Sequence, residues 1–162
     1  MISLLVAYTK NKRVIGAQGK IPWNLSSERN RFKKICAGKY VIMGRKSYEE
    51  IGHPLSYCEL VIVSRDPSSA SWTPRFCTSL EEAIQFCKAQ GQEEILIAGG
   101  GSIYEQALPY ADKIYATEIE ADFEGDTFFP VTGPEWTGTV EETHEENGIK
   151  FSYITLQKAD PQ

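Results

Sequence analysis

The 162-residue sequence lacks several features that would place it in other classes of protein. Basic residues are in the minority, because 17 Lys and Arg stand against 22 Asp and Glu, for a net charge of −5. A general nucleic-acid binder needs surplus positive charge to replace phosphate counterions, so we expect no nucleic-acid partner. No apolar run approaches the roughly 18 residues that a membrane-spanning helix needs. We therefore expect no membrane partner.

Metal ligands and disulfide patterns are also scarce. Neither of the two histidines, His53 and His144, has a second ligand at metal-binding spacing, so no metal site is predicted. There is no G-x-S-x-G motif of a serine hydrolase. The four cysteines are Cys36, Cys58, Cys77 and Cys87. None are in C-x-x-C spacing, and the N-terminal apolar run is too short for a signal peptide, so we expect reduced thiols in a cytoplasmic protein.

What the chain does contain is an alternation of short apolar runs and helical patterns. Strands are predicted at residues 2–8, 39–44, 59–64, 94–99 and 113–121. Helices are predicted at about 26–36, 45–51, 79–89 and 102–108. Val/Ile/Leu-rich strands separated by helices are typical of a mostly parallel sheet that is covered on both faces. Two further runs around Asn147-Gly148 predict a tight antiparallel hairpin, which makes the sheet mixed.

Two segments show no clear periodicity. One covers roughly residues 9–24, and the other covers about 122–137 and is rich in Gly, Pro and Asp. Long loops in a compact domain are usually lids or binding loops, although either segment is equally compatible with a plain surface excursion.

Three strand-to-helix turns contain residues that suit phosphate groups. VIMGRKSYEEIG places Gly44, two basic residues and a hydroxyl at a helix start, and VIVSRD ends a strand with Ser64 and Arg65. ILIAGGGSIYEQAL puts three glycines between a strand and a helix, although Tyr104 breaks the G-x-G-x-x-G fingerprint. Each turn alone is compatible with ordinary turn chemistry. Since ligands bind at the carboxyl ends of strands in open α/β sheets, the three together predict a dinucleotide site with an extra phosphate.

A carboxylate occupies the apolar side of the first predicted helix. In PWNLSSERNRF the helix begins near Ser26, and Glu28 shares a face with Phe32 and Ile35. This spacing directs Glu28 toward the core or toward a ligand pocket. The alternative is that Glu28 only complements the helix dipole and pairs with Arg31 at i+3, and the helix pattern leaves both open.

Four blocks of the chain resemble the dihydrofolate reductase family: IPWNLSSERNRFKK, VIMGRKSYEEIGHPL, IAGGGSIYEQALP and YATEIEADFEGDTFFP. Their order and spacing fit from Met1 to about Leu156. The resemblance implies a single α/β domain over residues 1–162, with a mixed, mostly parallel eight-stranded sheet, about four flanking helices and a C-terminal antiparallel hairpin. It implies NADPH-dependent reduction of dihydrofolate to tetrahydrofolate by a cytoplasmic monomer in one-carbon metabolism. Diaminopyrimidines and methotrexate would be its antifolate ligands.

The same resemblance assigns roles around the pterin. Glu28 would bind the pterin amino group and ring nitrogen and promote protonation beside the carbon that receives hydride, and desolvation there should raise its pKa. Trp23 would position a water, Thr117 would hydrogen-bond Glu28 and the pterin, and Tyr104 would lie near the nicotinamide. The implied substrate-binding residues are Leu5, Ala7, Ile21, Glu28, Phe32, Ile51, Leu55, Ala98 and Thr117.

For the cofactor, the resemblance implies a cis Gly99–Gly100 peptide beside the pyrophosphate. Arg65 would favour NADPH over NADH. Residues 17–21 would form a lid over the nicotinamide, and Asp126 would hydrogen-bond that lid. The implied cofactor-binding residues are Ala7, Ile15, Gly16, Gly44, Arg45, Lys46, Ser47, Ser64, Arg65, Gly99, Gly100, Gly101, Ser102, Ile103 and Tyr104.

One position departs from the family pattern. The family usually has an arginine for the folate glutamate carboxylate a few residues after its Pro-Leu, but HPLSYCEL has Cys58 there. A thiol cannot replace a guanidinium fork. One hypothesis is that Arg29 or Lys33 takes over this carboxylate, and the alternative is that both belong to a solvated helix face.

Two other functions stay open at this point. A pyrimidine reductase of riboflavin synthesis would share the fold and the cofactor, but Glu28 and Trp23 favour folate. A non-catalytic nucleotide-binding protein is the second alternative, and the set of Glu28, Thr117, Tyr104 and the glycine run argues against it.

Overall fold

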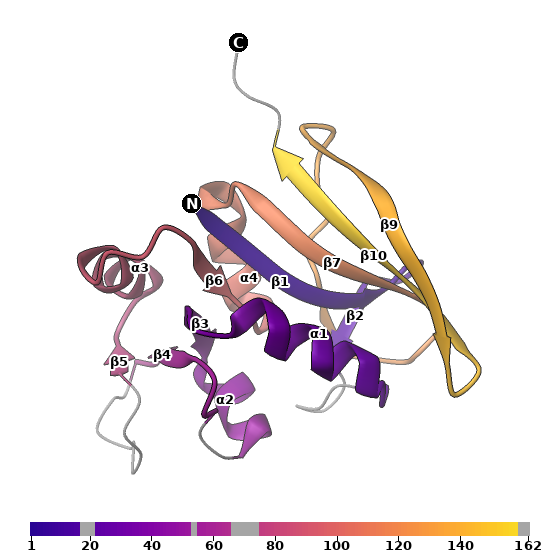
Figure 1. Cartoon of the computed structure of the whole chain (residues 1–162), viewed down its shortest axis with the longest axis horizontal. Helices are drawn as coiled ribbons and strands as arrows, with labels where there is room; N and C mark the ends of the chain where they lie inside the picture. The colour runs from indigo at the N-terminus through magenta and orange to yellow at the C-terminus, as the bar shows by residue number, and fades with distance from the viewer. Residues whose placement is uncertain (17–21, 53–54, 66–74, 159–162) are drawn as a thin grey trace.

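An eight-stranded sheet forms the centre of the protein in the computed structural model, which describes residues 1–16, 22–52, 55–65 and 75–158 (Figure 1). The strands lie in the order β5-β4-β3-β6-β1-β7-β10-β9. Their bounds are β1 Ile2–Thr9, β3 Tyr40–Gly44, β4 Glu59–Val63, β5 Arg75–Cys77, β6 Ile95–Ile97, β7 Lys113–Glu120, β9 Trp136–Glu146 and β10 Ile149–Lys158. Every pair from β5 to β7 is parallel, and β10 pairs antiparallel with β7 and β9. The predicted mixed, mostly parallel sheet is confirmed.

The described part of the chain contains four α-helices, which cover both faces of this sheet. They are α1 Ser26–Cys36, α2 Arg45–Ile51, α3 Leu80–Ala89 and α4 Gly101–Ala107, and a 3-10 turn follows α4 at Leu108–Tyr110. Alternate residues of β1 explain the two layers, because successive side chains of a strand point to opposite faces. Leu4 and Val6 pack with α3 and α4, whereas Leu5 packs with α1 and α2.

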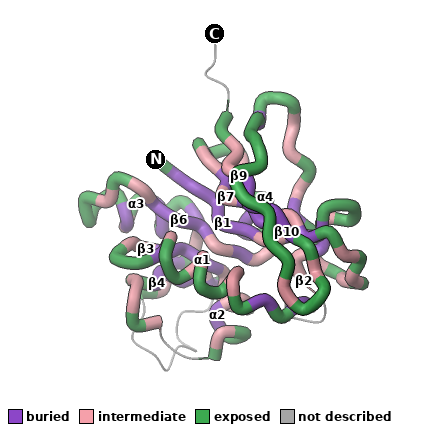
Figure 2. The backbone as a smooth tube through the Cα atoms, turned by 45° about the vertical axis from the view of Figure 1, so that its right-hand side comes forward, coloured by how far each residue is buried: buried purple, intermediate pink, exposed green. Residues whose placement is uncertain are grey.

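Burial is concentrated in the central strands, as Figure 2 shows. Seven of the eight residues of β1 are buried, and all three of β6. In the C-terminal hairpin, the middle of β10 is buried, while β9 is exposed along almost its whole length. The parallel centre therefore provides the rigid platform, and the hairpin forms an exposed edge.

The Asn-Gly hairpin prediction is confirmed. Strands β9 and β10 are joined by a two-residue turn in which Asn147 has a φ of 55° and Gly148 a φ of 77°. Two positive φ values are what a tight hairpin turn of the right twist requires, and Asn followed by Gly tolerates them best.

The two segments predicted as long loops are not structureless. Residues Val14–Gly16 form β2 and residues Thr127–Phe128 form β8, and the two strands pair antiparallel in a second small sheet. Strand β5 was not predicted either. These strands are three, two and three residues long, too short for a hydrophobic period, and they form only because a partner lies far along the chain.

Within the described residues, no helix is both long and apolar enough to cross a membrane. The same residues contain no group of three or more His, Cys, Asp or Glu side chains arranged to hold a metal ion.

Candidate active site

The first turn of α1 is held by a residue from the distant hairpin. Helix α1 follows Leu25, which has no side chain able to cap the free N–H groups of the first turn. Glu146, at the end of β9, instead accepts hydrogen bonds from the backbone N–H groups of Ser26 at 2.6 Å and Ser27 at 3.0 Å. Both serine hydroxyls also donate to it. These hydrogen bonds lower the pKa of Glu146 to about 2, and the bond from the Ser27 hydroxyl contributes most.

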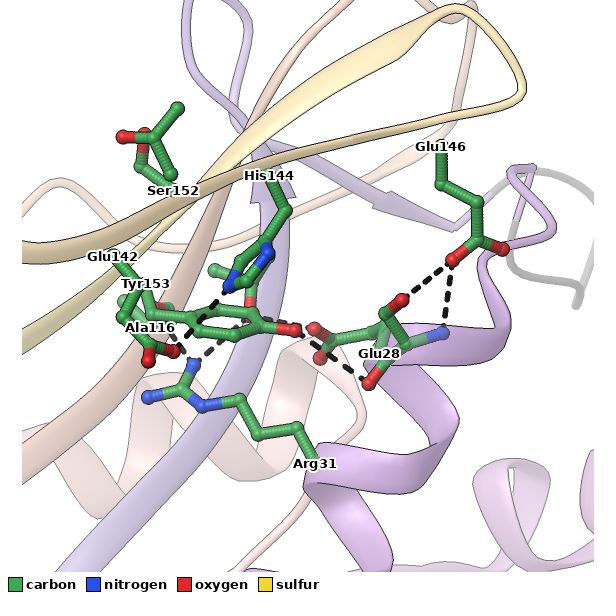
Figure 3. Close-up of polar contacts among 11 residues, drawn as sticks. Glu28, Arg31, Ala116, Glu142, His144, Glu146, Ser152 and Tyr153 are labelled. Carbon is green, nitrogen blue, oxygen red and sulfur yellow. Dashed lines mark hydrogen bonds and ion pairs between the residues drawn. The ribbon is translucent and has the colours of Figure 1, made fainter.

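This cap fixes the direction of the helix that carries Glu28. The Oγ1 hydroxyl of Thr117, on β7, donates to Oε2 of Glu28 at 2.7 Å, so the predicted Thr117–Glu28 hydrogen bond is confirmed (Figure 3). The alternative of a pair with Arg31 at i+3 is borne out as a charge interaction, which lowers the pKa of Glu28. Arg31 donates through Nη1 to Thr117 Oγ1 at 3.0 Å and to the Ala116 carbonyl at 3.2 Å.

Burial raises the pKa of Glu28 to about 7, although the Thr117 hydrogen bond and the positive charge of Arg31 both lower it. The raised pKa that desolvation predicts is therefore confirmed. A carboxyl group that titrates near neutrality is able to hold a proton and to release it at the same pH. That is the property a general acid or base needs.

Most of the predicted apolar residues lie together beside this helix. Leu5 from β1 and the partly buried Phe32, Ile51, Leu55 and Ala98 belong to one hydrophobic cluster between α1, α2 and the sheet. Because four of these side chains keep part of their surface exposed, they form an apolar face that a flat ring is able to cover. Their contact with substrate stays a prediction.

Trp23 and Ala7 lie in a different cluster. Trp23 is buried, and its ring centroid is 5.8 Å from that of Phe123. Ala7 packs against the same group, which also contains Leu25, Phe151 and Tyr153. The water that Trp23 was predicted to position stays a prediction.

Tyr104 is buried between the two predicted halves of the site. Its hydroxyl donates to the Leu5 carbonyl at 2.7 Å, and its ring meets Phe129 edge-on at 5.3 Å. Burial raises its pKa strongly, and the charge of Glu28 adds to the effect. Tyr104 therefore stays a neutral phenol, fixed in direction by Leu5.

The glycine-rich turn after β6 packs directly on the turn after β3. The predicted cis peptide between Gly99 and Gly100 is present, and the Gly99 carbonyl accepts from Gly44 N at 2.7 Å. A Cβ on Gly100 would lie 3.1 Å from Ser47 Oγ, and one on Gly101 would lie 2.7 Å from Thr127 Cγ2. A side chain at Gly101 would therefore collide with Thr127, and one at Gly100 would press against Ser47.

All three turns that were predicted to bind phosphate lie at the carboxyl ends of neighbouring strands, on the same side of the sheet. Strands β4, β3 and β6 are adjacent and parallel, so Ser64, the 44–47 turn and the glycine run follow neighbouring strand ends. Ser64 is buried, whereas Lys46 and Arg65 are exposed. Arg45 has a partner on its own helix, because its Nε lies 2.8 Å from Oε1 of Glu49.

Other residues that were predicted to bind the cofactor lie near the same strand ends, on β2 and on α4. Ile15 Cδ1 lies 3.8 Å from the position of a Cβ on Gly101. Ser102 and Ile103 lie in the first turn of α4, and Ile103 packs against Gly44. Asp126 N donates to the Gly16 carbonyl at 3.0 Å. The predicted lid at 17–21, which includes Ile21, and His53 lie outside the described residues.

The two basic residues suggested for the folate tail differ in their surroundings. Arg29 donates to Oδ1 of Asn24, before the helix. The Nζ of Lys33 lies 5.8 Å from the ring centroid of Tyr57, the residue next to Cys58. Of the two, Lys33 is the one that lies beside the segment where the family arginine is missing.

This geometry defines an α/β protein in which a buried acid lies beside a glycine-rich turn at the carboxyl ends of parallel strands. A sequence model described as "Dihydrofolate reductase" matches residues 1–158. The dihydrofolate reductase of Staphylococcus haemolyticus is 41% identical over 92% of this chain and 86% of its own length. That of Haemophilus influenzae is 40% identical over 96% and 98%, and the type 3 dihydrofolate reductase of Salmonella typhimurium is 36% identical over 98% of both.

The chain therefore belongs to the dihydrofolate reductase family, whose members are oxidoreductase enzymes. Two contacts of the candidate site were missed by the sequence reasoning: the Glu146 cap and the bond from Arg31 to Thr117. The cap left no local signal, since 119 residues separate Glu146 from Ser27. Arg31 did leave one, because an arginine at i+3 from a pocket acid is placed to affect it.

Proposed function

We propose that this chain catalyses the NADPH-dependent reduction of 7,8-dihydrofolate to 5,6,7,8-tetrahydrofolate. The observation that carries the proposal is the Glu28–Thr117 hydrogen bond of 2.7 Å beside the apolar cluster of Leu5, Phe32 and Ile51. Membership of the family, and the names of its similar members, supply the substrate.

The substrate's amino group and adjacent ring nitrogen would face the Glu28 carboxyl. An ionised carboxylate accepts both N–H groups as a charge-assisted pair. Thr117 Oγ1 donates to Glu28 and accepts from Arg31, so one lone pair is left to accept from the amino group. The apolar residues would exclude water from the ring and strengthen these bonds.

The reaction adds a hydride to the carbon and a proton to the nitrogen of one C=N bond. When bound, the nicotinamide supplies the hydride. The protein's part is the proton, and a carboxyl group with a pKa of about 7 is suited to promote its delivery. Tyr104, held by Leu5, would fix the position of the ring that donates the hydride.

The residues at the strand edge fit a phosphorylated dinucleotide. The glycine run offers backbone without side chains, which allows a pyrophosphate to approach its N–H groups. Lys46 and Arg65 are exposed cations at the ends of β3 and β4, and Arg65 would select the additional phosphate of NADPH. Arg45 would bind phosphate in exchange for Glu49.

The folate glutamate would be bound by Lys33, since Cys58 has no charge to offer. Lys33→Ala should raise the dihydrofolate KM about tenfold, the loss of one exposed charged hydrogen bond. Arg29→Ala, the matched control on the same helix, should change it less. If neither variant changes the dihydrofolate KM, the proposed role of Lys33 is wrong.

The deciding experiment follows NADPH absorbance with and without dihydrofolate, for the wild type and Glu28→Gln. We expect turnover in the wild type, and a loss of roughly 10²- to 10⁴-fold in Glu28→Gln, the range of general acid-base catalysis. NADPH binding without dihydrofolate turnover would contradict the proposed substrate. The riboflavin-pathway pyrimidine would then be tested.

We also propose that the enzyme acts as a cytoplasmic monomer that supplies one-carbon metabolism and binds diaminopyrimidine and methotrexate antifolates. All four cysteines are free thiols, which suits a reducing compartment. Glu28 would pair with the protonated ring of a diaminopyrimidine as it does with the pterin.

A further inference from the structure

The residue that the proposed mechanism leaves unused is Arg31. Its guanidinium is fixed on three sides (Figure 3). Nη1 donates to the Ala116 carbonyl at 3.2 Å and to Thr117 Oγ1 at 3.0 Å, and Cζ lies 4.1 Å from the centroid of the Tyr153 ring. An arginine on a solvated helix face would not be held by a backbone carbonyl, a hydroxyl and an aromatic face at once.

The chemistry of the groups fixes the direction of this hydrogen-bond chain. A guanidinium has donors only, so Thr117 must accept from Arg31. The hydroxyl has one hydrogen, and with Arg31 on a lone pair that hydrogen is left for Glu28 Oε2. With Arg31 on a lone pair of its oxygen, the Thr117 hydroxyl donates its hydrogen to the Glu28 carboxyl group.

The direction decides where Glu28 carries its proton. In a protonated carboxyl group the carbonyl oxygen is the acceptor and the other oxygen carries the hydrogen. Because Oε2 accepts from Thr117, the proton of Glu28 belongs on Oε1. The two bonds of 3.0 and 2.7 Å also keep the guanidinium within about 6 Å of the carboxylate, close enough for its charge to favour ionisation.

We infer that Arg31 is a positioning residue for Glu28, acting through the Thr117 hydroxyl to direct the dissociable proton to Oε1 and to favour the ionised carboxylate. The inference deepens the proposed function and rests on it for its effect on turnover. Its effect on Glu28 itself is a property of the protein without substrate.

The other titratable groups around Glu28 do not share this role. Tyr104 from α4 and Tyr153 from β10 both have pKa values raised, first by burial, and stay neutral near pH 7. On the far side of Tyr153 lies His144 from β9, with its ring centroid 5.0 Å away and Glu142 in contact at 3.3 Å. His144→Gln therefore serves as the control for a change at the neighbouring ring that makes no contact with Thr117.

The test is the titration of the Glu28 carboxyl carbon by ¹³C NMR in the ligand-free enzyme, with the signal assigned through Glu28→Gln. In Arg31→Gln we expect the midpoint to rise by about one pH unit, because a favourable charge is lost. Arg31→Lys keeps the charge and should return most of the shift. His144→Gln should leave the midpoint in place.

A double-mutant cycle with Thr117→Val tests the relay. If Arg31 acts through the hydroxyl, the shift caused by Arg31→Gln should be smaller in the Thr117→Val background than in the wild type. A folded Arg31→Gln enzyme with an unmoved Glu28 midpoint would overturn the inference, even if it melts at a lower temperature. So would an equal shift in both backgrounds.

Turnover separates this inference from the proposed function. In single-turnover hydride transfer, the pH at which the rate falls should rise in Arg31→Gln by the shift seen in the NMR titration. Should the wild type fail to reduce dihydrofolate, the proposed function would fall, and the NMR titration would still decide the role of Arg31.

Discussion

The two halves of the candidate site are built in different ways. The half predicted to bind the cofactor consists mainly of backbone: glycines 99–101 pack against Ser47 and Thr127, and Gly44 packs against Ile103 and the Gly99–Gly100 backbone. The acid half consists of side chains, in which Glu28 depends on Thr117 from β7 and on a helix capped from β9. A backbone site is fixed by where small residues stand in the sequence, whereas a side-chain site is fixed by contacts between distant segments.

The comparison predicts that the acid half lowers the free energy of unfolding more than the glycine-rich half does. The pKa of Glu28 in the folded enzyme is about 7, above the ordinary value of 4.5. Below pH 4.5 the group is protonated in both states, and its contribution to the free energy of unfolding is fully present. As pH rises through 7 that contribution is lost, by roughly 3 kcal/mol for this difference in pKa.

Glu28→Gln removes this loss. Relative to the wild type, its free energy of unfolding should improve by roughly 3 kcal/mol between pH 4 and pH 8, in addition to any constant offset. Urea unfolding of the ligand-free proteins at several pH values measures the difference. Parallel pH profiles for the two proteins would show that Glu28 is not buried at such a cost.

In the half predicted to bind the cofactor, a substitution of glycine is expected to act by steric clash. A Cβ on Gly101 would lie 2.7 Å from Thr127 Cγ2, so Gly101→Ala should lower the free energy of unfolding by about 1–3 kcal/mol and weaken NADPH binding. Thr127→Ser removes that methyl group and should restore much of the loss in the double variant. Additive effects of the two changes would mean that the crowding lies elsewhere.

The Glu146 cap joins the hairpin to the helix of the acid half. Glu146→Gln should lower the melting temperature at pH 7, while Glu145→Gln, at the exposed neighbouring position, should not. Because the pKa of Glu146 is lowered to about 2, its stabilisation is present above pH 4.5 and is lost as pH falls through 2. The two variants should therefore converge in melting temperature in strong acid. A difference in melting temperature that persists at pH 2 would mean that the charge of Glu146 is not what stabilises the helix.

The smallest expected effect concerns Glu49, the partner of Arg45. The pair is largely exposed and spaced i, i+4, so Glu49→Gln should change stability by only about 0.3–0.5 kcal/mol. It should nevertheless tighten NADPH binding in low salt, because Arg45 no longer shares its charge with a carboxylate. Fluorescence titration at two salt concentrations measures this, with Glu50→Gln as the neighbouring control. Unchanged affinity would mean that Arg45 does not meet the cofactor.

Much of this protein followed from the sequence alone. Strand and helix patterns predicted the mixed sheet, α1 and the Asn147-Gly148 hairpin, because hydrophobic period and turn chemistry are local properties. The glycine run predicted a turn between a strand and a helix, and it lies between β6 and α4. The two- and three-residue strands β2, β5 and β8 escaped prediction, since only their distant partners make them strands.

Only the tertiary structure decided how Glu28 works. The helix pattern placed its carboxylate on the apolar face, but the pairing of β1 with β7 brings Thr117 to the site, and α1 then meets Thr117 with both Glu28 and Arg31. The pKa of about 7 follows from that burial and those two partners. Burial and charge depend on distance in space, and the sequence states only distance along the chain.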